Sequence, residues 1–467
     1  MYFNYFCNFI IILIFTFIGC TSSLQNDEKS LLRNYVNKYD PSFRYDITDT
    51  LLEDGWTEYK IKMFSGSWLD KNTFESNSNE WWHWVSMIVP NNLENNNSMM
   101  IIGSGSKNDI KKTNSQYVKA ALTTKSIVSE ISNIPFQPID FSGDNKKGRY
   151  EDDLIAYSWR QFLEGGAKNH EWLPRFPMTR AVVRAMDVVQ EISKQLTNPI
   201  DSFFVTGASK RGWVTWTTAI ADDRVIGIAP VVIDLLNLYP SFQHHWKVYG
   251  EWSPAIDDYV KEDIMNWTES EEYEKLIEIT DPYSYISSLD MPKYIINASS
   301  DEFFVTDSWQ FYWDDLVGQK HLQYLPNAGH GLYGTYVTDE LINFYYKIIN
   351  NKEFPNYKWS IDQNTFNIII DPSADYQIKQ WSINSSERDF RIYKVGESWT
   401  SNDIIKNKDG KYSITIEKPA NGYSAHFIEI IFDPELNESI SFTTGTVVLP
   451  NQYPFSKFVI PNPKGKR

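Results

Sequence analysis

Cysteine is scarce in this sequence, which limits how the fold can be held together. Only two cysteines occur among 467 residues, Cys7 and Cys20. Both lie in or beside an apolar N-terminal run, and cleavage before Cys20 would leave one thiol and no intrachain disulfide. The fold must rest on an apolar core, which 42% hydrophobic and 15% aromatic residues can supply in about two or three domains.

Positive charge is also in short supply. The chain has 44 Lys and Arg residues against 60 Asp and Glu residues, which gives a formal net charge of -16. The acidic residues are scattered throughout the chain, and the sequence contains no basic stripe. Such a chain repels phosphate backbones, so we exclude nucleic acid as a partner.

Histidine is limited to seven residues. None forms the helically spaced pair with a glutamate that zinc hydrolases use, and His83 near Glu80 stands in a strand-like aromatic run. We therefore predict no metal site and no cofactor.

A long hydrophobic run occurs only at the N-terminus. Residues 1–19 carry no charge and residues 9–18 are almost wholly apolar, which is typical of a signal sequence, although the usual Lys or Arg near the start is missing. The run is short for a bilayer span of about 20 residues. We therefore predict its cleavage and an exported protein, either secreted or held in the periplasm or cell envelope.

Two interpretations of Cys20 remain open. Gly19 before it and the polar residues 21–23 after it resemble a bacterial lipobox, although Phe17 is an unusual member of one. Lipidation of Cys20 would anchor the protein to a membrane. Ordinary secretory cleavage near Cys20 would leave the protein without an anchor.

After a polar segment at residues 20–43, strand and helix signals alternate as far as residue 353. Apolar runs bounded by turn residues predict strands, and apolar residues at helical spacing predict helices. This alternation indicates a mainly parallel sheet flanked by helices over residues 44–353. The predicted strands are residues 56–63, 81–89, 98–102, 202–206, 226–232, 294–298 and 322–325, and the clearest helices are residues 178–196 and 210–221.

Two further segments complete the predicted organisation. Residues 235–290 form an insertion rich in Tyr, Trp and acidic residues, which we interpret as a lid over a pocket, with simple packed helices as the alternative. Residues 354–467 change to short alternating runs, which predict an antiparallel β-sandwich domain. Its expected strands include residues 366–370, 390–393, 412–416 and 424–431.

Ser209 is the candidate nucleophile. A serine hydroxyl needs an imidazole to take its proton, a carboxylate to orient the imidazole, and donors for the oxyanion. Residues 207–212 follow a predicted strand and open a predicted helix, which is typical of the tight turn that exposes a catalytic serine. The motif departs from the common pattern, because Arg211 stands where a second glycine is usual and Gly212 follows it.

Asp301 and His330 complete the candidate triad. Each follows a predicted strand, and the order serine, acid, histidine is that of the α/β-hydrolase fold, whose parallel strands deliver such residues to one sheet edge. We therefore predict this fold for residues 44–353. The alternatives are that Asp301 caps the N-terminus of a helix, that Asp307 is the acid instead, and that His330 is a simple turn residue.

Backbone groups at two places are candidates for the oxyanion hole. One is the N–H of Lys210, directly after the nucleophile, and the other is an N–H of the Gly103–Ser104 turn. Arg211 could bind a carboxylate or phosphate of the substrate, or it could anchor a neighbouring loop or acid.

Residues 207–213 with 222–225 resemble the PhoPQ-activated pathogenicity-related protein family, which includes autocrine proliferation repressor proteins. The resemblance covers nearly the whole mature chain and extends to residues 42–45, 80–83, 176–178, 184–187, 281–283, 300–304, 327–330 and 388–391. It implies an exported α/β-hydrolase domain with a C-terminal β-domain, related in fold to dipeptidyl peptidases and secreted esterases. It does not specify the substrate.

We predict an exported serine hydrolase that cleaves an ester or peptide/amide bond of a small molecule or peptide through an acyl-enzyme intermediate. The alternative is a secreted signalling or binding protein that retains the hydrolase scaffold without using it, because a fold does not determine function.

Overall fold

The computed structural model describes residues 31–76, 78–109, 112–435 and 438–467. The predicted signal sequence, Cys7 and Cys20 lie outside the described residues. Within the described ranges, no helix is both long and apolar enough to cross a membrane.

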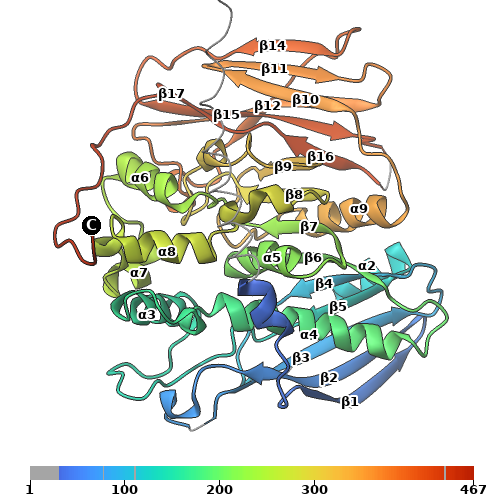
Figure 1. Ribbon diagram of the computed structural model, residues 1–467. Coiled ribbons are helices and arrows are strands. Elements are labelled where there is room, and N and C mark those ends of the chain that lie inside the picture. Colours follow the sequence, from blue (N-terminus) through green and yellow to red (C-terminus); the bar gives the residue numbers. More distant parts are fainter. Residues whose placement is uncertain (1–30, 77, 110–111, 436–437) are drawn as a thin grey trace, which may run out of the picture.

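A nine-stranded sheet crosses the molecule (Figure 1), in the order β1-β2-β3-β5-β4-β6-β7-β8-β9. The pairs from β1 to β5 are antiparallel, whereas every pair from β5 to β9 is parallel. The parallel strands are buried along most of their length, as expected for a sheet covered on both faces. The bounds are β1 (Arg44–Glu53), β2 (Trp56–Ser67), β3 (Glu80–Pro90), β4 (Asn97–Ile102), β5 (Ile127–Ile131), β6 (Ser202–Ala208), β7 (Val225–Val231), β8 (Lys293–Ala298) and β9 (Lys320–Leu325).

Helices cover both faces of this sheet. Apolar residues of α3 (Glu151–Glu164), α4 (Arg175–Ser193) and α5 (Lys210–Ala221) share one core with the sheet, and those of α2 (Ser115–Thr124) and α9 (Val337–Ile349) belong to a second core. This is the predicted α/β-hydrolase fold, and the fold class is confirmed. Because β6, β8 and β9 run parallel, the turns after them meet at one edge of the sheet.

The insertion between β7 and β8 consists of helices joined by loops and stands beside that edge (Figure 1). The C-terminal tail is tied to it: Phe458 packs on Trp246 and Trp252 with ring centroids 4.7 and 5.0 Å apart, and the Glu271 N–H donates to the Lys466 carbonyl. The insertion is therefore a packed layer held from outside by the tail. Its elements are α6 (Leu238–Tyr249), η3 (Pro254–Ile256), α7 (Asp257–Lys261), η4 (Ile264–Trp267), α8 (Glu271–Thr280) and η5 (Pro282–Ser288).

The C-terminal part forms two antiparallel sheets that enclose a common apolar core. One contains β10 (Tyr357–Asp362), β11 (Thr365–Ile370) and β14 (Lys411–Thr415); the other contains β13 (Thr400–Asp403), β12 (Tyr376–Ser385), β15 (Tyr423–Phe432), β16 (Ile440–Thr443) and β17 (Val447–Leu449). The remaining short helices are η1 (Lys71–Thr73), η2 (His170–Trp172), η6 (Ser308–Phe311) and α10 (Ile392–Val395).

The strand predicted at residues 390–393 is wrong, because this stretch leads into α10. Arg391 is buried beside Asp389, and its Nε donates to Asp389 Oδ1 at 2.8 Å. The alternation of apolar and polar residues here reflects a buried ion pair and not the two faces of a strand.

The sandwich shares its core with the hydrolase sheet, because β16 packs against β9. The Tyr324 N–H donates to Thr443 Oγ1 at 3.0 Å, the Tyr294 hydroxyl donates to the Ser441 carbonyl at 2.6 Å, and Phe442 stacks on His321 with ring centroids 4.2 Å apart. The two parts therefore stabilise each other.

We predict that Phe442→Ala lowers the free energy of unfolding by about 3–5 kcal/mol, because it removes a fully buried ring from this shared core. Denaturant titration measures the effect. Ile405→Ala is the control, since Ile405 is 92% exposed, and we expect a change within about 0.5 kcal/mol. A Phe442→Ala loss no larger than that of the control would contradict a shared core.

Candidate active site

Ser209 occupies a strained turn between β6 and α5. Its backbone angles are φ 59° and ψ -127°, a conformation that a residue with a side chain rarely adopts. The Ser209 N–H donates to the Val231 carbonyl at 2.8 Å, which holds the turn against β7. Strain of this kind is typical of a turn that lifts a nucleophile above the sheet.

Two glycines allow this turn to be so tight. A Cβ at Gly207 would lie 2.8 Å from the Arg211 carbonyl oxygen, and one at Gly212 would lie 3.0 Å from both the Gly207 and Val231 carbonyl oxygens. The second glycine of the motif is therefore needed at Gly212, where α5 approaches β6 and β7. This explains why Arg211 can stand where a glycine is more usual.

His330 and Asp301 lie in contact after β9 and β8. His330 Nδ1 is 2.9 and 3.0 Å from the two carboxylate oxygens of Asp301. Asp301 Oδ1 also accepts the N–H of Phe303 at 2.7 Å, and the His330 backbone N–H donates to Glu302 Oε2 at 2.6 Å. The Phe303 ring packs on the imidazole with centroids 4.2 Å apart, so His330 is held from several sides.

Asp307, the rival acid, belongs to a different buried group. It accepts a hydrogen bond from Arg388 Nη2 at 2.6 Å and lies 2.8 Å from Nε2 of His244. Burial by itself would raise the pKa of Asp307, but Arg388 and His244 hold it well below the usual range. The structure therefore places Asp301, and not Asp307, beside His330.

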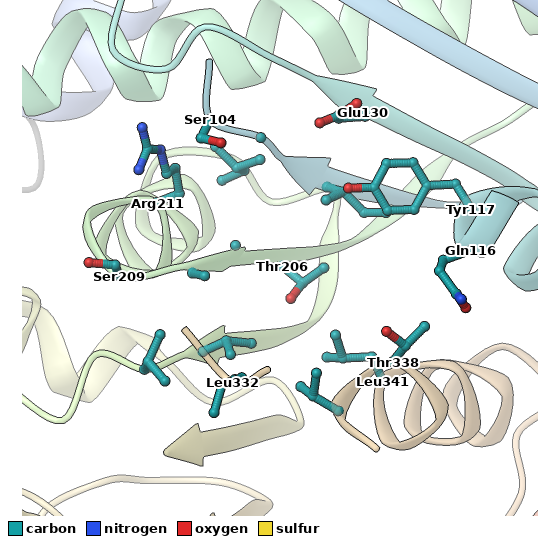
Figure 2. A pocket seen from close by; sticks show the side chains of 18 of the residues that line it. Ser104, Gln116, Tyr117, Glu130, Thr206, Ser209, Arg211, Leu332, Thr338 and Leu341 are labelled. Carbon is teal, nitrogen blue, oxygen red and sulfur yellow. The ribbon is translucent and has the colours of Figure 1, made fainter. Parts of the chain in front are cut away.

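Ser209 and His330 line the same pocket, whose volume is about 610 Å³. No hydrogen bond joins Ser209 Oγ to His330 Nε2 among the described residues, and such contacts are often long in unliganded enzymes. Figure 2 shows Ser209 and Ser104 towards one end of this pocket and Tyr117 and Thr338 towards the other.

The candidate oxyanion donors have different neighbours. The N–H of Lys210 is the first of α5, where a helix offers no internal acceptor. The Gly103 N–H already donates to the Ile131 carbonyl at 2.7 Å, so it is not available to an oxyanion. Ser104 lies beyond the strand that ends at Ile102, and its N–H is the better candidate in that turn.

Arg211 and Lys210 share carboxylates of α3. Arg211 Nε donates to the Ile134 carbonyl at 2.7 Å, and its Nη2 pairs with Glu151. Lys210 Nζ lies 2.8 Å from Glu151 and 2.9 Å from Asp152. Arg211 therefore anchors a loop and an acid, the second of the two predicted roles, although it also lines the 610 Å³ pocket.

The charge on Glu151 is stabilised by these neighbours. Burial works to raise its pKa, but Arg211 and Lys210 together lower it to about 2. A depressed carboxyl pKa contributes stability above the unfolded value of about 4.3, and this stability is lost as the pH falls towards the folded value.

A second, smaller cavity also borders Ser209. Its volume is about 40 Å³, and it is lined by Ser209, Lys210, Asp152 and Arg175 together with apolar side chains of α5, α6 and the turn after β8. His330 lines the large pocket but not this cavity.

Comparison with known proteins gives a family. The sequence profile of the PhoPQ-activated pathogenicity-related proteins matches residues 32–391. The chain belongs to this family. "Autocrine proliferation repressor protein A" of Dictyostelium discoideum is 35% identical over 455 residues, covering 91% of each chain.

Several solved structures are also similar to this PhoPQ-related chain. An acetyl xylan esterase from Paenibacillus sp. R4 has a TM-score of 0.49 at 12% identity, covering 70% of this chain and 98% of its own. A glucuronoyl esterase from Solibacter usitatus has a TM-score of 0.40 at 12% identity, covering 72% and 94%. The family resemblance seen in the sequence is confirmed by the profile match over residues 32–391 and by the Dictyostelium relative.

Four residues around the site were not recognised in the sequence. Glu302 supports the backbone of His330, Glu151 and Asp152 pair with the start of α5, and Arg175 begins α4 beside the small cavity. Glu302 directly follows Asp301, which is a usable signal. The other three are distant from Ser209 along the chain, and no local pattern points to them.

We predict that Glu151→Gln lowers the free energy of unfolding at pH 7 by about 3 kcal/mol, because a carboxylate with a depressed pKa is removed. The difference from wild type should shrink as the pH falls from 4.5 towards 2. Urea titrations across this range measure it, with Glu164→Gln on the exposed side of α3 as control. A difference independent of pH would contradict the assigned role of Glu151.

Proposed function

We propose that this protein is a serine hydrolase that cleaves an ester or amide bond through an acyl-enzyme intermediate. Ser209 Oγ attacks the carbonyl carbon while His330 Nε2 accepts the hydroxyl proton, and Asp301 stabilises the imidazolium. The N–H groups of Lys210 and Ser104 donate to the oxyanion. The alcohol or amine leaves with the proton from His330, and a water molecule then releases the acyl group by the same steps in reverse.

One observation carries this proposal. A strained serine turn and a His330–Asp301 pair with a 2.9 Å contact stand at the same edge of the sheet and open onto one pocket. Strained backbone persists only where the surrounding structure enforces it, and it is concentrated at functional sites.

The two cavities suggest how a substrate lies. The leaving group must receive its proton from His330, so it belongs on the side of His330, in the 610 Å³ pocket. We assign the acyl group to the 40 Å³ cavity, which Ser209 also lines. We therefore propose a substrate with a bulky leaving group and a short acyl group.

A signalling function is the second candidate. It is favoured by the name of the Dictyostelium relative, a proliferation repressor. In either case we propose that the chain is exported, because residues 1–19 are apolar and uncharged. Lipidation of Cys20 and ordinary secretion remain the two possible routes.

We predict that a fluorophosphonate probe labels the purified protein and that Ser209→Ala abolishes the labelling, because only an activated serine attacks such a probe at a useful rate. Ser398→Ala is the control, since Ser398 is exposed and lies outside both cavities. A folded wild-type protein that is not labelled would favour the signalling candidate.

We also predict that Asp301→Asn lowers kcat on an activated ester by about 10⁴-fold with little change in KM, because the imidazole loses its orienting carboxylate. Asp307→Asn serves as the comparison. It breaks the contact with Arg388 and should lower stability, but kcat of the folded protein should stay within about threefold of wild type. Equal losses of kcat in both variants would overturn the assignment of Asp301.

A further inference from the structure

Arg175 is a buried guanidinium without a carboxylate partner among the described residues. It is 3% exposed, and within the described part of the chain its hydrogen bonds come from Nη1 alone, to the Lys210 carbonyl at 2.9 Å and to Met178 Sδ at 3.7 Å. Its Nε has no acceptor, and the guanidinium lies over the Trp213 ring, 4.7 Å from the centroid. The Nε/Nη2 edge is thus without an acceptor in the described part of the chain.

This situation sets Arg175 apart from comparable residues. The other described arginines that are buried to a similar degree each form an ion pair, namely Arg149, Arg180, Arg211, Arg388 and Arg391. A buried charge without a partner costs several kcal/mol. Burial lowers the pKa of Arg175 to about 10, so its side chain still carries a proton at neutral pH.

The carboxylates nearest the start of α5 pair with the other two cations. Glu151 pairs with Lys210 and Arg211, and Asp152 pairs with Lys210. Asp152 is already engaged, since its oxygens accept from Lys210 Nζ at 2.9 Å and from the Tyr259 hydroxyl at 3.1 Å. Neither carboxylate accepts a hydrogen bond from Arg175 among the described residues, so the guanidinium is left with an edge that a ligand carboxylate could fill.

We propose that Arg175 binds a carboxylate carried by the acyl group of the substrate, so that the enzyme hydrolyses half-esters or half-amides of short dicarboxylic acids. The inference rests on the proposed function, because the acyl group was assigned to the cavity that Ser209 and Arg175 both line. The Nε/Nη2 edge of a guanidinium matches a planar carboxylate. The small volume of the cavity, about 40 Å³, favours a short acyl group.

The reaction follows the ordinary acyl-transfer steps. Ser209 Oγ forms a bond to the ester carbonyl carbon, the alcohol departs with the serine proton delivered by His330, and the half-acid remains on Ser209 as an ester. Water then adds to that ester, returns a proton to Ser209 through His330, and releases the dicarboxylic acid. Arg175 holds the distal carboxylate throughout and exchanges no proton.

The experiment compares two esters that differ only at the distal group. 4-Nitrophenyl hydrogen succinate carries the carboxylate, and 4-nitrophenyl 4-oxopentanoate has a methyl ketone in its place. After subtraction of spontaneous hydrolysis, we expect the wild-type kcat/KM to favour the acid at least tenfold. Arg175→Met should abolish this preference, and Arg175→Lys should retain part of it.

Arg180→Met is the matched control. Arg180 is buried on the same helix but pairs with Asp40 and does not line the cavity, so its loss should lower stability and leave the acid-to-ketone ratio unchanged. A ratio unaltered by Arg175→Met would overturn the proposal and leave Arg175 as a support for the Lys210 carbonyl. Hydrolysis of the ketone ester without preference for the acid would overturn it too, while leaving the hydrolase function intact.

A second measurement uses the wild-type protein alone, in case Arg175→Met does not fold. Monomethyl succinate should slow fluorophosphonate labelling of Ser209 at concentrations where dimethyl succinate does not. Equal protection by the two compounds would overturn carboxylate recognition. Absence of labelling without any ligand would instead count against the proposed hydrolase function itself.

Discussion

The close approach of α5 to strands β6 and β7 is the constraint on which the site depends. It bends the backbone of Ser209 to φ 59°. It also requires glycine at positions 207 and 212, because a Cβ atom at either position would collide with neighbouring carbonyl groups. The same approach exposes the Ser209 side chain and leaves the Lys210 N–H without a helical acceptor. Nucleophile position and oxyanion donor are therefore consequences of one packing contact.

Charged side chains then secure the start of α5 at a considerable desolvation penalty. Lys210 and Arg211 are buried, which is tolerated because Glu151 and Asp152 of α3 pair with them. Arg175 reaches the same place from α4 and uses one edge to support the Lys210 carbonyl. Its other edge has no acceptor in the described structure, and this asymmetry suggests a substrate group as its partner.

The C-terminal part also stabilises the site, although it contributes no member of the triad. Arg388 Nη2 donates a hydrogen bond to Asp307 Oδ2 at 2.6 Å, and Asp307 in turn contacts His244 of the insertion. Tyr453 of the tail lies 3.0 Å from the same histidine. The insertion, the turn after β8 and the sandwich are thus joined by one buried polar network, which keeps the helices over the small cavity in place.

Hydrophobic patterning in the sequence was sufficient for a mainly parallel sheet flanked by helices, and short motifs such as residues 207–213 were sufficient for the family, because both are local signals. The motif around Ser209 and the strand-end positions of Asp301 and His330 were visible for the same reason. The partners of Lys210, the engaged N–H of Gly103 and the isolation of Arg175 were not, since each depends on contacts between segments distant in the chain. The prediction of a strand at residues 390–393 was wrong for the same reason. Arg391 is buried together with its ion-pair partner, and only the tertiary structure decides which charged side chains are paired in the interior.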